Sequence, residues 1–522
     1  MLMASLDLSS ALLVMAALAV IIQYFSARRM HSRFPLPPGP KKLPIVGNLF
    51  NKPQAPEYEA YVELGRKLNS DIIHLNLAGQ SVVNLLSSTV TDDLLEKRSA
   101  LYSDRPSLPM YTDVIGWDFN FTFFKYGEKW RAHRRLFSET LNSAGSRRFR
   151  PQQLTAARKM LHGLLATPDD FIAHFRQMAG EFIINVAYGI KVSPVNDPYI
   201  MLAEEGIKAI EATIAGRFLV NTFPILRFIP EWFPGAGFKR QAREWRKVGH
   251  AMRDGAFDER TTFNIQQQMD TAAHSFTAEY LQKLNEGRAT YYNEDTIKTT
   301  AATMYLGGAD TVLSSFASFV LAMLANPAAQ KRAQMEIDSV TGGKRLPNFD
   351  DEDALPYVSA LCKEVLRWRP VAPGGLPHFL AVEDQYNGYT LPANSIIVPN
   401  IWSGAILHDE AMYPDPQAFK PERFLLDGKL NPNVRDPQAA FGFGRRICPG
   451  RFLAQASVFI TVASILATFD ITKYIGTNGQ PVEPTYEYSS GIVAAPLPFK
   501  CSIRPRSGAA AALVEAGDSE DD

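Results

Sequence analysis

The pattern of hydrophobic and polar residues along the chain predicts a fold that is mainly helical. Apolar residues recur at helical spacing from Asn293 to Ala325, with acids in the first turn and Pro327 just beyond the end. A second apolar run, from Phe452 to Phe469, also indicates a helix. Residues 71–77 and 81–86 alternate between apolar and polar instead, which predicts a small hairpin with a short turn between them.

The N-terminal region has the pattern of a membrane anchor. Residues 8–25 carry no charge and have an apolar centre over residues 11–22, near the lower limit of about 17–25 residues for a spanning helix. Basic residues follow this stretch and none precedes it, so the positive-inside rule places the body of the protein in the cytosol. A cleaved signal peptide is the alternative, but its charged first part is missing. We predict an anchor over residues 1–30 and a proline-rich hinge over residues 31–44, ahead of a body over residues 45–506.

Two irregular segments and the C-terminus lack a clear periodicity. Residues 105–124 form an aromatic, proline-broken stretch whose apolar content argues against disorder. Residues 221–238 combine several aromatic residues with three prolines, and they form either an apolar surface or a buried core loop. Residues 507–522 are rich in alanine and then in acids, which predicts a disordered tail.

Charge and cysteine content narrow the classes of partner and compartment. The 522 residues include 54 Lys and Arg and 54 Asp and Glu, so the net charge is near zero. A nucleic-acid partner, which would call for a basic surplus, is therefore not expected. Only three cysteines occur, which argues against a disulfide framework and indicates a reducing compartment.

One of these cysteines, Cys448, follows a glycine- and arginine-rich loop and lies just before the second predicted helix. The backbone N–H groups and the dipole of a helix N-terminus favour an anion, and hence a thiolate. A structural zinc site needs about four ligands at short regular spacings, so a lone thiolate suits it poorly. A single thiolate is what a heme iron takes from a cysteine axial ligand.

The residues around Cys448 resemble a known family. Phe441, Gly444, Arg446, Cys448 and Gly450 match the pattern Phe-x-x-Gly-x-Arg-x-Cys-x-Gly of the cytochrome P450 superfamily. The resemblance implies that Cys448 is the heme-iron ligand and that Phe441, Arg446 and Gly450 belong to the cofactor site. A surface loop with an incidental buried cysteine is the alternative interpretation, and three further motifs argue against it.

The first of these motifs lies midway along the long predicted helix. Two glycines in a helix interior cost about 1 kcal/mol each relative to alanine, so we expect Gly307 and Gly308 to open the backbone toward a flat ligand or O2. Residues 307–311 also match the family's (Ala/Gly)-Gly-x-(Asp/Glu)-Thr motif, and the resemblance implies that Asp310 and Thr311 relay protons during O2 activation. A groove for helix packing would explain the glycines, but not an Asp next to a Thr in an apolar helix.

The other two motifs supply charged residues. Glu364 and Arg367 are three residues apart and share a helix face, and with Arg423 they match the family's Glu-x-x-Arg…Arg triad, a buried network that braces the heme loop.

Trp130 and Arg134 are four residues apart, so they also share a helix face. The resemblance implies that these two residues, together with Arg446 and His378, hold the heme propionates. His378 stands where arginine is commoner in the family, so its protonation state stays open.

The resemblance implies a mainly α fold, the helical prism with small β-sheets of the cytochromes P450, plus one N-terminal transmembrane helix. It also implies a heme b monooxygenase that oxidises a lipophilic small molecule with O2. Electrons would come from an NADPH-dependent, flavin-containing reductase, with cytochrome b5 as an optional second donor. Arg131 and Arg135 would form either a solvated helix face or part of a docking patch for such an acidic partner.

Residues 93–98 and 102–106 resemble fungal members in particular, which implies an enzyme of secondary-metabolite biosynthesis. The anchor and the Pro-Pro-Gly-Pro hinge resemble microsomal members, which implies the endoplasmic-reticulum membrane. The resemblance also makes residues 105–124 a lid over the distal face of the heme, and residues 221–238 a loop that dips into the bilayer beside the substrate entrance. Two alternatives stay open. One is a heme-thiolate isomerase or dehydratase, and the other is a non-catalytic heme-binding membrane protein.

By position relative to the family's substrate-contacting segments, seven residues are expected on the substrate pocket walls: Leu108, Met110, Phe121, Met304, Tyr305, Leu376 and Ile492. Because most of these residues are apolar, we expect a neutral, lipophilic substrate such as a terpenoid or polyketide. The carboxylates of Asp113 and Asp118 could pair with an amine, so an amine substrate is the alternative.

Overall fold

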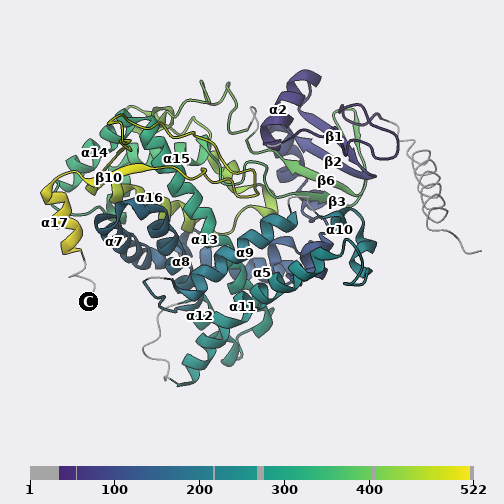
Figure 1. The fold of residues 1–522 in the computed structure, drawn as a ribbon, viewed down its shortest axis with the longest axis horizontal. Helices are drawn as coiled ribbons and strands as arrows, with labels where there is room; N and C mark the ends of the chain where they lie inside the picture. The colour runs from purple at the N-terminus through teal and green to yellow at the C-terminus, as the bar shows by residue number, and fades with distance from the viewer. Residues whose placement is uncertain are drawn as a thin grey trace, which may run out of the picture.

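The computed structural model describes residues 34–54, 56–194, 196–214, 218–266, 275–402 and 406–517. Helices dominate these ranges and the strands form small sheets, which confirms the predicted mainly α fold (Figure 1). The predicted membrane anchor, residues 1–30, lies outside the described residues.

The helices of nine or more residues are α2 (Glu57–Leu68), α5 (Glu128–Leu141), α7 (Arg150–Ala166), α8 (Phe171–Tyr188), α9 (Pro198–Ile214), α11 (Gly237–Gln266), α12 (Phe276–Asn285), α13 (Glu294–Ala325), α14 (Pro327–Thr341), α15 (Pro356–Trp368), α16 (Arg451–Thr468) and α17 (Gly508–Ala516). The shorter α-helices are α3 (Ser88–Thr91), α4 (Ser99–Tyr102), α6 (Ser143–Ser146) and α10 (Leu219–Thr222). The strands are β1 (Ile72–Leu77), β2 (Gln80–Leu85), β3 (His378–Leu380), β4 (Asp384–Tyr386), β5 (Tyr389–Leu391), β6 (Ser395–Pro399), β7 (Leu425–Leu426), β8 (Lys429–Leu430), β9 (Phe469–Lys473) and β10 (Cys501–Pro505).

Helix α13 runs through the middle of the helical body (Figure 1). Its bounds agree with the sequence prediction, because the Asn293 side chain accepts the N–H of Thr296 in a capping box and Pro327 follows its last turn. Helices α13 and α16 are long and apolar enough to cross a membrane by composition, yet both are mostly buried inside the protein. They therefore form the core of the described body.

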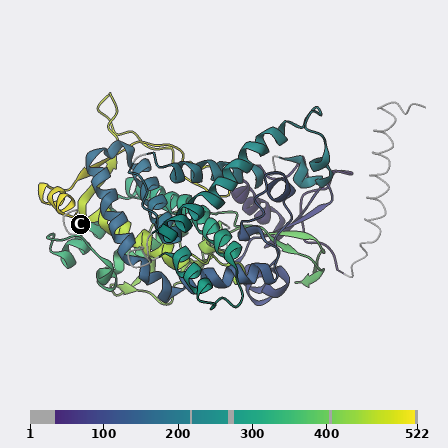
Figure 2. The same cartoon turned by 90° about the horizontal axis from the view of Figure 1, so that it is seen from below.

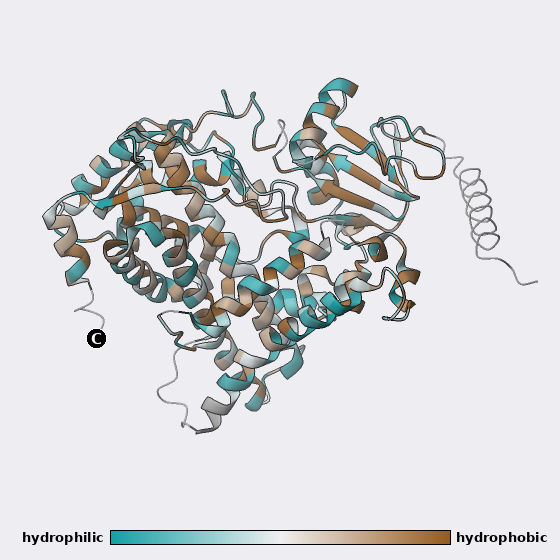
Figure 3. Ribbon diagram, in the orientation of Figure 1, coloured by the Kyte–Doolittle hydropathy of each residue, from teal (hydrophilic) through white to brown (hydrophobic). Residues whose placement is uncertain are grey.

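The predicted hairpin is confirmed as strands β1 and β2, which pair antiparallel from Ile72–Leu85 to Leu77–Gln80. Ala78 and Gly79 both have positive φ, 50° and 98°, as a two-residue hairpin turn requires. Strand β6 then pairs parallel to β2 and antiparallel to β3, which gives the order β1-β2-β6-β3. The strands of this sheet are largely hydrophobic (Figure 3), and the sheet lies at the opposite end of the molecule from α17 (Figure 2).

The proline-rich segment is fastened to this end of the protein. The carbonyl of Pro38 accepts the N–H of His74 at 2.9 Å, and that of Pro35 accepts the N–H of Thr390 at 2.8 Å. A Cβ on Gly39 would lie 1.9 Å from the carbonyl oxygen of His74, so only glycine fits there. Residues 35–40 thus pack against the sheets as part of the body.

Two sequence expectations need correction. The predicted disordered tail is helix α17 over Gly508–Ala516, where Ser507 caps the first turn and Val514 is buried; residues 518–522 lie outside the described chain. Alanine has the highest helix propensity, which favours a helix here, and burial of Val514 against the body stabilises it. The idea that residues 221–238 form a buried core loop is also wrong, because Ile225 and Trp232 are 71% and 81% exposed.

Candidate active site

A cavity of about 330 Å³ lies between α13 and the loop that precedes α16. Its wall combines apolar side chains with one thiol, three guanidinium groups and one imidazole, and no Asp or Glu of the described chain lines it. All seven residues predicted to hold a cofactor line this one cavity: Trp130, Arg134, His378, Phe441, Arg446, Cys448 and Gly450. The fold therefore brings these residues together from distant parts of the sequence.

The loop before α16 positions Cys448. The Cys448 N–H donates to the carbonyl of Phe441 at 2.8 Å, which closes the loop on itself. Gly444 has a φ of 56°, and a Cβ there would lie 2.1 Å from the carbonyl oxygen of Leu95. Glycine is thus required at this close approach, and the thiol is left at the cavity wall three residues before α16 begins.

Opposing effects act on the Cys448 thiol. Burial raises its pKa, while the N–H of Gly450 and the guanidinium groups of Arg134 and Arg451 lower it. Within the described ranges, no group of three or more His, Cys, Asp or Glu side chains could hold a metal ion. Cys448 therefore lacks, among the described residues, the four protein ligands of a structural zinc site.

Three arginines line the cavity beside this thiol: Arg105 and Arg446 are buried, and Arg134 is half-buried. Burial lowers the pKa of Arg105 to about 9, with a further contribution from Arg446. Burial likewise lowers the pKa of Arg134 to about 10 and that of Arg446 to about 10. Because no carboxylate lines the cavity, this cluster is electrostatically suited to an anionic ligand.

Backbone carbonyls hold these guanidinium groups in place. Arg446 donates from Nε to Ser103 at 2.6 Å and from Nη2 to Phe124 at 2.7 Å, and its guanidinium carbon lies 4.5 Å from the centre of the Trp130 ring. Its third nitrogen, Nη1, is buried and has no partner. Arg134 donates to the carbonyl of Ile447 at 2.6 Å. The unsatisfied Nη1 is the clearest sign that a ligand oxygen belongs here.

His378 is held as a neutral imidazole. Burial, together with Arg105 and Arg446, shifts its pKa well below the ordinary value. Its Nδ1 lies 2.8 Å from the carbonyl of Tyr102, so Nδ1 must carry the hydrogen and Nε2 is left as an acceptor. His378 can donate to a carboxylate from Nε2 only after protonation, which an anionic ligand beside it would favour.

On the opposite wall, α13 stays continuous through its glycine pair, so the predicted opening of the backbone does not occur. A Cβ on Gly308 would lie 2.5 Å from Cγ1 of Ile183, so this glycine serves close packing against α8. A Cβ on Gly307 would meet nothing within 4 Å, and Gly307 borders the cavity. The Thr311 hydroxyl, also on the wall, donates to the carbonyl of Gly307 at 2.7 Å.

Asp310 does not line the cavity. Burial raises its pKa to about 6; Arg176 and Lys208 oppose this shift, whereas Glu204 and Glu211 add to it. Asp310 is thus poised to gain or lose a proton near neutral pH, on the side of α13 that faces charged residues of α8 and α9.

The charged triad forms a closed, buried network. Glu364 accepts from Nε and Nη2 of Arg367 at 2.7 and 2.8 Å, and Nε of Arg423 lies 3.1 Å from both of its oxygens. The side chains of Glu364 and Arg367 are fully buried. Arg367 also donates to the carbonyl of Leu407, and its guanidinium group lies over the ring of Tyr413. The Tyr413 hydroxyl in turn donates to the carbonyl of Arg435. The network thereby ties α15 to the chain that leads into the Cys448 loop.

Comparison with known proteins agrees with this site. The family model described as Cytochrome P450 matches residues 37–503. The chain belongs to the cytochrome P450 family. It is 42% identical over 514 residues to Cytochrome P450 monooxygenase 98 of Postia placenta (strain ATCC 44394 / Madison 698-R), covering 97% of each chain. It is 40% identical over 521 residues to Cytochrome P450 monooxygenase ple1 of Rhodocybe pseudopiperita, covering 98% of each. It is also 38% identical over 504 residues to Tryptamine 4-monooxygenase of Psilocybe cyanescens, covering 95% of this chain and 98% of that protein.

The cytochrome P450 family implies a heme with a cysteine thiolate ligand, and the residues of this cavity fit that group. A thiol at a helix N-terminus suits the iron, while the arginine cluster and the orphaned Nη1 of Arg446 suit the two propionate carboxylates. The chain is an oxidoreductase of the monooxygenase type, as its relatives are.

Sequence reasoning missed one member of this cytochrome P450 site. Arg105 is buried on the cavity wall and donates to the carbonyls of Leu376 and Pro377 at 2.9 and 2.6 Å. Its signal was the Ser-Asp-Arg-Pro run of residues 103–106, which resembles fungal members. The resemblance placed Arg105 only at the start of a lid over the distal face of the heme and predicted no contact of its own.

The predicted substrate walls are reproduced only in part. Phe121, Met304 and Leu376 line the cavity. The other four are not among its lining residues: Leu108, Met110, Tyr305 and Ile492. Asp113 and Asp118 are exposed and lie outside the cavity, so neither provides a carboxylate for an amine there.

Replacing Arg446 by leucine is expected to lower the heme content of this cytochrome P450. The change removes three buried donors, one of which has no protein partner. Charge-assisted bonds of this kind contribute about 1.5–3 kcal/mol each, so we expect at least a tenfold loss of heme affinity. Heme per protein, measured by absorbance after purification, checks this result. The exposed neighbour gives the control: Arg445→Leu should keep full heme content, and equal losses in both variants would contradict the role of Arg446.

Proposed function

We propose that the protein is a heme-thiolate monooxygenase that oxidises a neutral, lipophilic small molecule with O2 and electrons from an NADPH-dependent reductase. One observation carries this proposal. The Cys448 thiol, an arginine cluster without a carboxylate partner and a largely apolar wall meet in the same cavity. These relatives are fungal proteins, and for this chain we propose a role in fungal secondary metabolism.

In this proposal Cys448 binds the heme iron, and Arg105, Arg134, Arg446 and Trp130 orient the propionates. When bound, the heme supplies the redox centre at which O2 is reduced. Phe441 and Gly450 shape the loop that presents the thiol. The Glu364 triad braces the chain that leads into that loop, through Tyr413 and Arg435.

The chemistry of the cavity favours a neutral substrate. Near Phe121 and Leu376 the wall also includes Leu141, Phe182 and Val371, all apolar. A substrate amine would find no carboxylate among the described lining residues. The name of the Psilocybe relative gives that protein a tryptamine substrate, and for this chain we propose a terpenoid- or polyketide-like molecule instead.

We further propose attachment to the endoplasmic-reticulum membrane, supported by the uncharged stretch over residues 8–25 and by the exposed apolar loop around Trp232. The reductase, with cytochrome b5 as an optional second donor, would dock on the side of α5 that exposes Arg131 and Arg135. Arg131 and Arg135 are 53% and 62% exposed, although Arg131 approaches Glu128 and Arg135 pairs with Glu139, so both cations are accessible.

Thr311 and Asp310 have different positions in the proposed proton delivery. Because the Thr311 hydroxyl donates to Gly307, its oxygen is left to accept a hydrogen bond from a donor in the cavity. Asp310, with a pKa of about 6, holds an exchangeable proton on the outer side of α13. In this proposal Asp310 connects Thr311 to solvent and exchanges its proton there.

Replacing Thr311 by alanine is expected to uncouple oxygen reduction from product formation. Positioned proton transfer contributes about 10²–10⁴-fold, so product formed per NADPH should fall by about 10²-fold while peroxide rises and NADPH oxidation continues. Product, peroxide and NADPH are measured together in the reconstituted enzyme. Thr303→Ala is the matched control, because Thr303 also lines the cavity and donates to a carbonyl four residues earlier on α13. Unchanged coupling in Thr311→Ala would refute the relay.

The test of the function as a whole uses the purified full-length chain with NADPH and a cytochrome P450 reductase. A screen of lipophilic candidates, chosen by comparing metabolites of deletion and parent strains, should yield an oxygenated product that requires NADPH. A rearranged product without NADPH would favour an isomerase. Heme binding with no turnover of the compound that accumulates in the deletion strain would favour a non-catalytic heme protein.

A further inference from the structure

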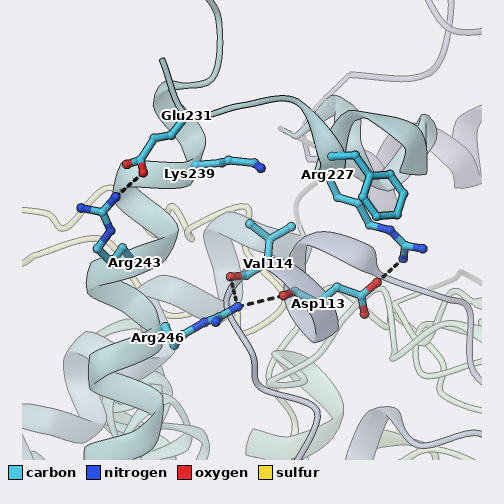
Figure 4. A pocket seen from close by; sticks show the side chains of 8 residues that line it. Asp113, Val114, Arg227, Glu231, Lys239, Arg243 and Arg246 are labelled. Atoms are coloured by element: carbon cyan, nitrogen blue, oxygen red, sulfur yellow. Dashed lines mark hydrogen bonds and ion pairs between the residues drawn. The ribbon is translucent and has the colours of Figure 1, made fainter. Parts of the chain in front are cut away.

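A second pocket, of about 470 Å³, opens on the surface between α11 and the loop that follows α10 (Figure 4). Three separate segments form its walls: the short helix over Met110–Val114, the loop around Pro224–Phe228 and the first turns of α11. Six of its lining residues are charged: Asp113, Arg227, Glu231, Lys239, Arg243 and Arg246. This pocket is distinct from the Cys448 cavity, with which it shares no lining residue.

The pocket carries a surplus of positive charge. Four cations and two carboxylates line it, so its formal charge is 4 − 2 = +2. Arg227 pairs with Asp113 and Arg243 with Glu231, which accounts for both carboxylates. The surplus therefore rests on Lys239 and Arg246.

These two cations are not neutralised by the protein. Arg246 donates to the backbone carbonyls of Asp113 and Val114 at 2.9 and 2.8 Å, which satisfies hydrogen bonds without cancelling charge. Lys239 makes no side-chain hydrogen bond or ion pair with the described residues, and its ammonium group extends across the opening toward Arg227 (Figure 4). Because Lys239, Arg243 and Arg246 are spaced by four and three residues, they share one face of α11 and point into the same space.

The rim of the pocket is apolar and exposed. Ile225, Phe228 and Trp232 are 71%, 67% and 81% exposed, on the loop that supplies Arg227 and Glu231. Soluble surfaces rarely gather large apolar side chains in this way. Phe50 is also 78% exposed. It lies two residues after Asn48, whose N–H donates to the carbonyl of Asn76 on β1. Helix α10, which precedes the apolar rim, lies at the same end of the molecule as the β1-β2-β6-β3 sheet (Figure 1).

We infer that this pocket binds the phosphate of an anionic phospholipid, with the apolar rim of Ile225, Phe228 and Trp232 in the acyl region of the same leaflet. A lipid phosphate matches the +2 surplus, and the adjacent rim matches the chains attached to it. Lys239 and Arg246 supply the ligand contacts, while the two ion pairs hold the walls. The inference rests on the proposed membrane attachment and is independent of the oxidation chemistry.

The test uses the full-length heme-loaded protein in a nonionic detergent and a short-chain phosphatidic acid below its micellar concentration. Tryptophan fluorescence, with Trp232→Phe to identify the reporter, should show saturable binding. Lys239→Gln should weaken this binding about fivefold, the value expected for one cation at a lipid surface. Lys239→Arg should restore it.

Arg240→Gln is the matched control, because it removes the same charge one residue along α11 from an exposed side chain outside the pocket. It should change binding by less than about twofold. An equal loss in both variants would mean general charge attraction and would overturn the site.

Two further ligands identify what is bound. If short-chain phosphatidylcholine binds as tightly as phosphatidic acid, the apolar rim alone accounts for binding. If inorganic phosphate binds as tightly as phosphatidic acid, the pocket is a free-anion site. Either result overturns the assignment to an anionic lipid. The carbon monoxide spectrum of each variant shows that the heme site is intact, so failure here is separable from failure of the monooxygenase proposal.

Discussion

Replacing Cys448 by alanine is expected to abolish the red-shifted Soret band of the reduced carbon monoxide complex and all NADPH-supported oxidation. Cys448 is the one thiol on the cavity wall among the described lining residues, so no other side chain there can supply a thiolate to the iron. Cys362 and Cys501 are both buried elsewhere, and burial raises the pKa of each, that of Cys501 to about 12. The reduced carbon monoxide spectrum and product analysis check this result together.

Cys501, one of the two buried cysteines outside the cavity, provides the matched control. Cys501→Ala makes the same chemical change on strand β10, in the core, and should cost about 1 kcal/mol of folding stability with an unchanged spectrum. If Cys448→Ala retained the red-shifted band, the assignment of the ligand would be wrong. If Cys501→Ala lost it as well, the loss would reflect misfolding and not ligation.

The long helix and the hairpin were predictable because local signals determine their ends. Asn293 caps α13 and Pro327 terminates it, and the alternation over residues 71–86 with a short turn between its halves predicts a strand pair. The structure buries both faces of this pair, which the alternation alone did not indicate. The helix over residues 508–516 was not predicted, because its acidic end suggested disorder. Its stability depends on burying Ala510 and Val514 against the body, a tertiary effect.

The cofactor cavity was predictable as a set of residues, since the motifs that carry them are short and local. What the motifs do not contain is the geometry between them. The partnerless Nη1 of Arg446, the hydrogen bond from Thr311 to Gly307 and the outward position of Asp310 all depend on how distant segments pack.

Arg105 and the substrate walls show the same limit. Arg105 belongs to a loop without periodicity, and its contacts with Leu376 and Pro377 span more than 270 positions. Tyr305 follows Met304 on α13, yet its hydroxyl turns away from the cavity to the carbonyl of Tyr199. Adjacent helix residues point in directions about 100° apart, so membership of a substrate-contacting segment does not place a side chain on the wall.

Replacing Glu364 by alanine is expected to lower the free energy of unfolding of the protein strongly. Glu364 is fully buried and accepts from two arginines and from the backbone N–H of Lys420 at 2.8 Å. Its removal leaves Arg367 and Arg423, which are 0% and 7% exposed, as buried cations without a carboxylate. Breaking a buried pair in this way costs about 3–5 kcal/mol. Urea unfolding followed by far-UV circular dichroism measures the loss.

Glu422→Ala is the matched control for this prediction. Glu422 lies next to Arg423 but is half-exposed, and it pairs with the exposed Arg332 at 3.0 Å, so its loss should cost no more than about 1 kcal/mol. The loss of stability in Glu364→Gln should fall between those of the two alanine variants, because glutamine keeps an acceptor oxygen but not the charge.

Arg367 contacts Tyr413, which is hydrogen-bonded to Arg435 in the chain that leads into the Cys448 loop, so the folded Glu364→Ala protein should also bind less heme. Equal stability of Glu364→Ala and Glu422→Ala would show that the triad does not brace the fold.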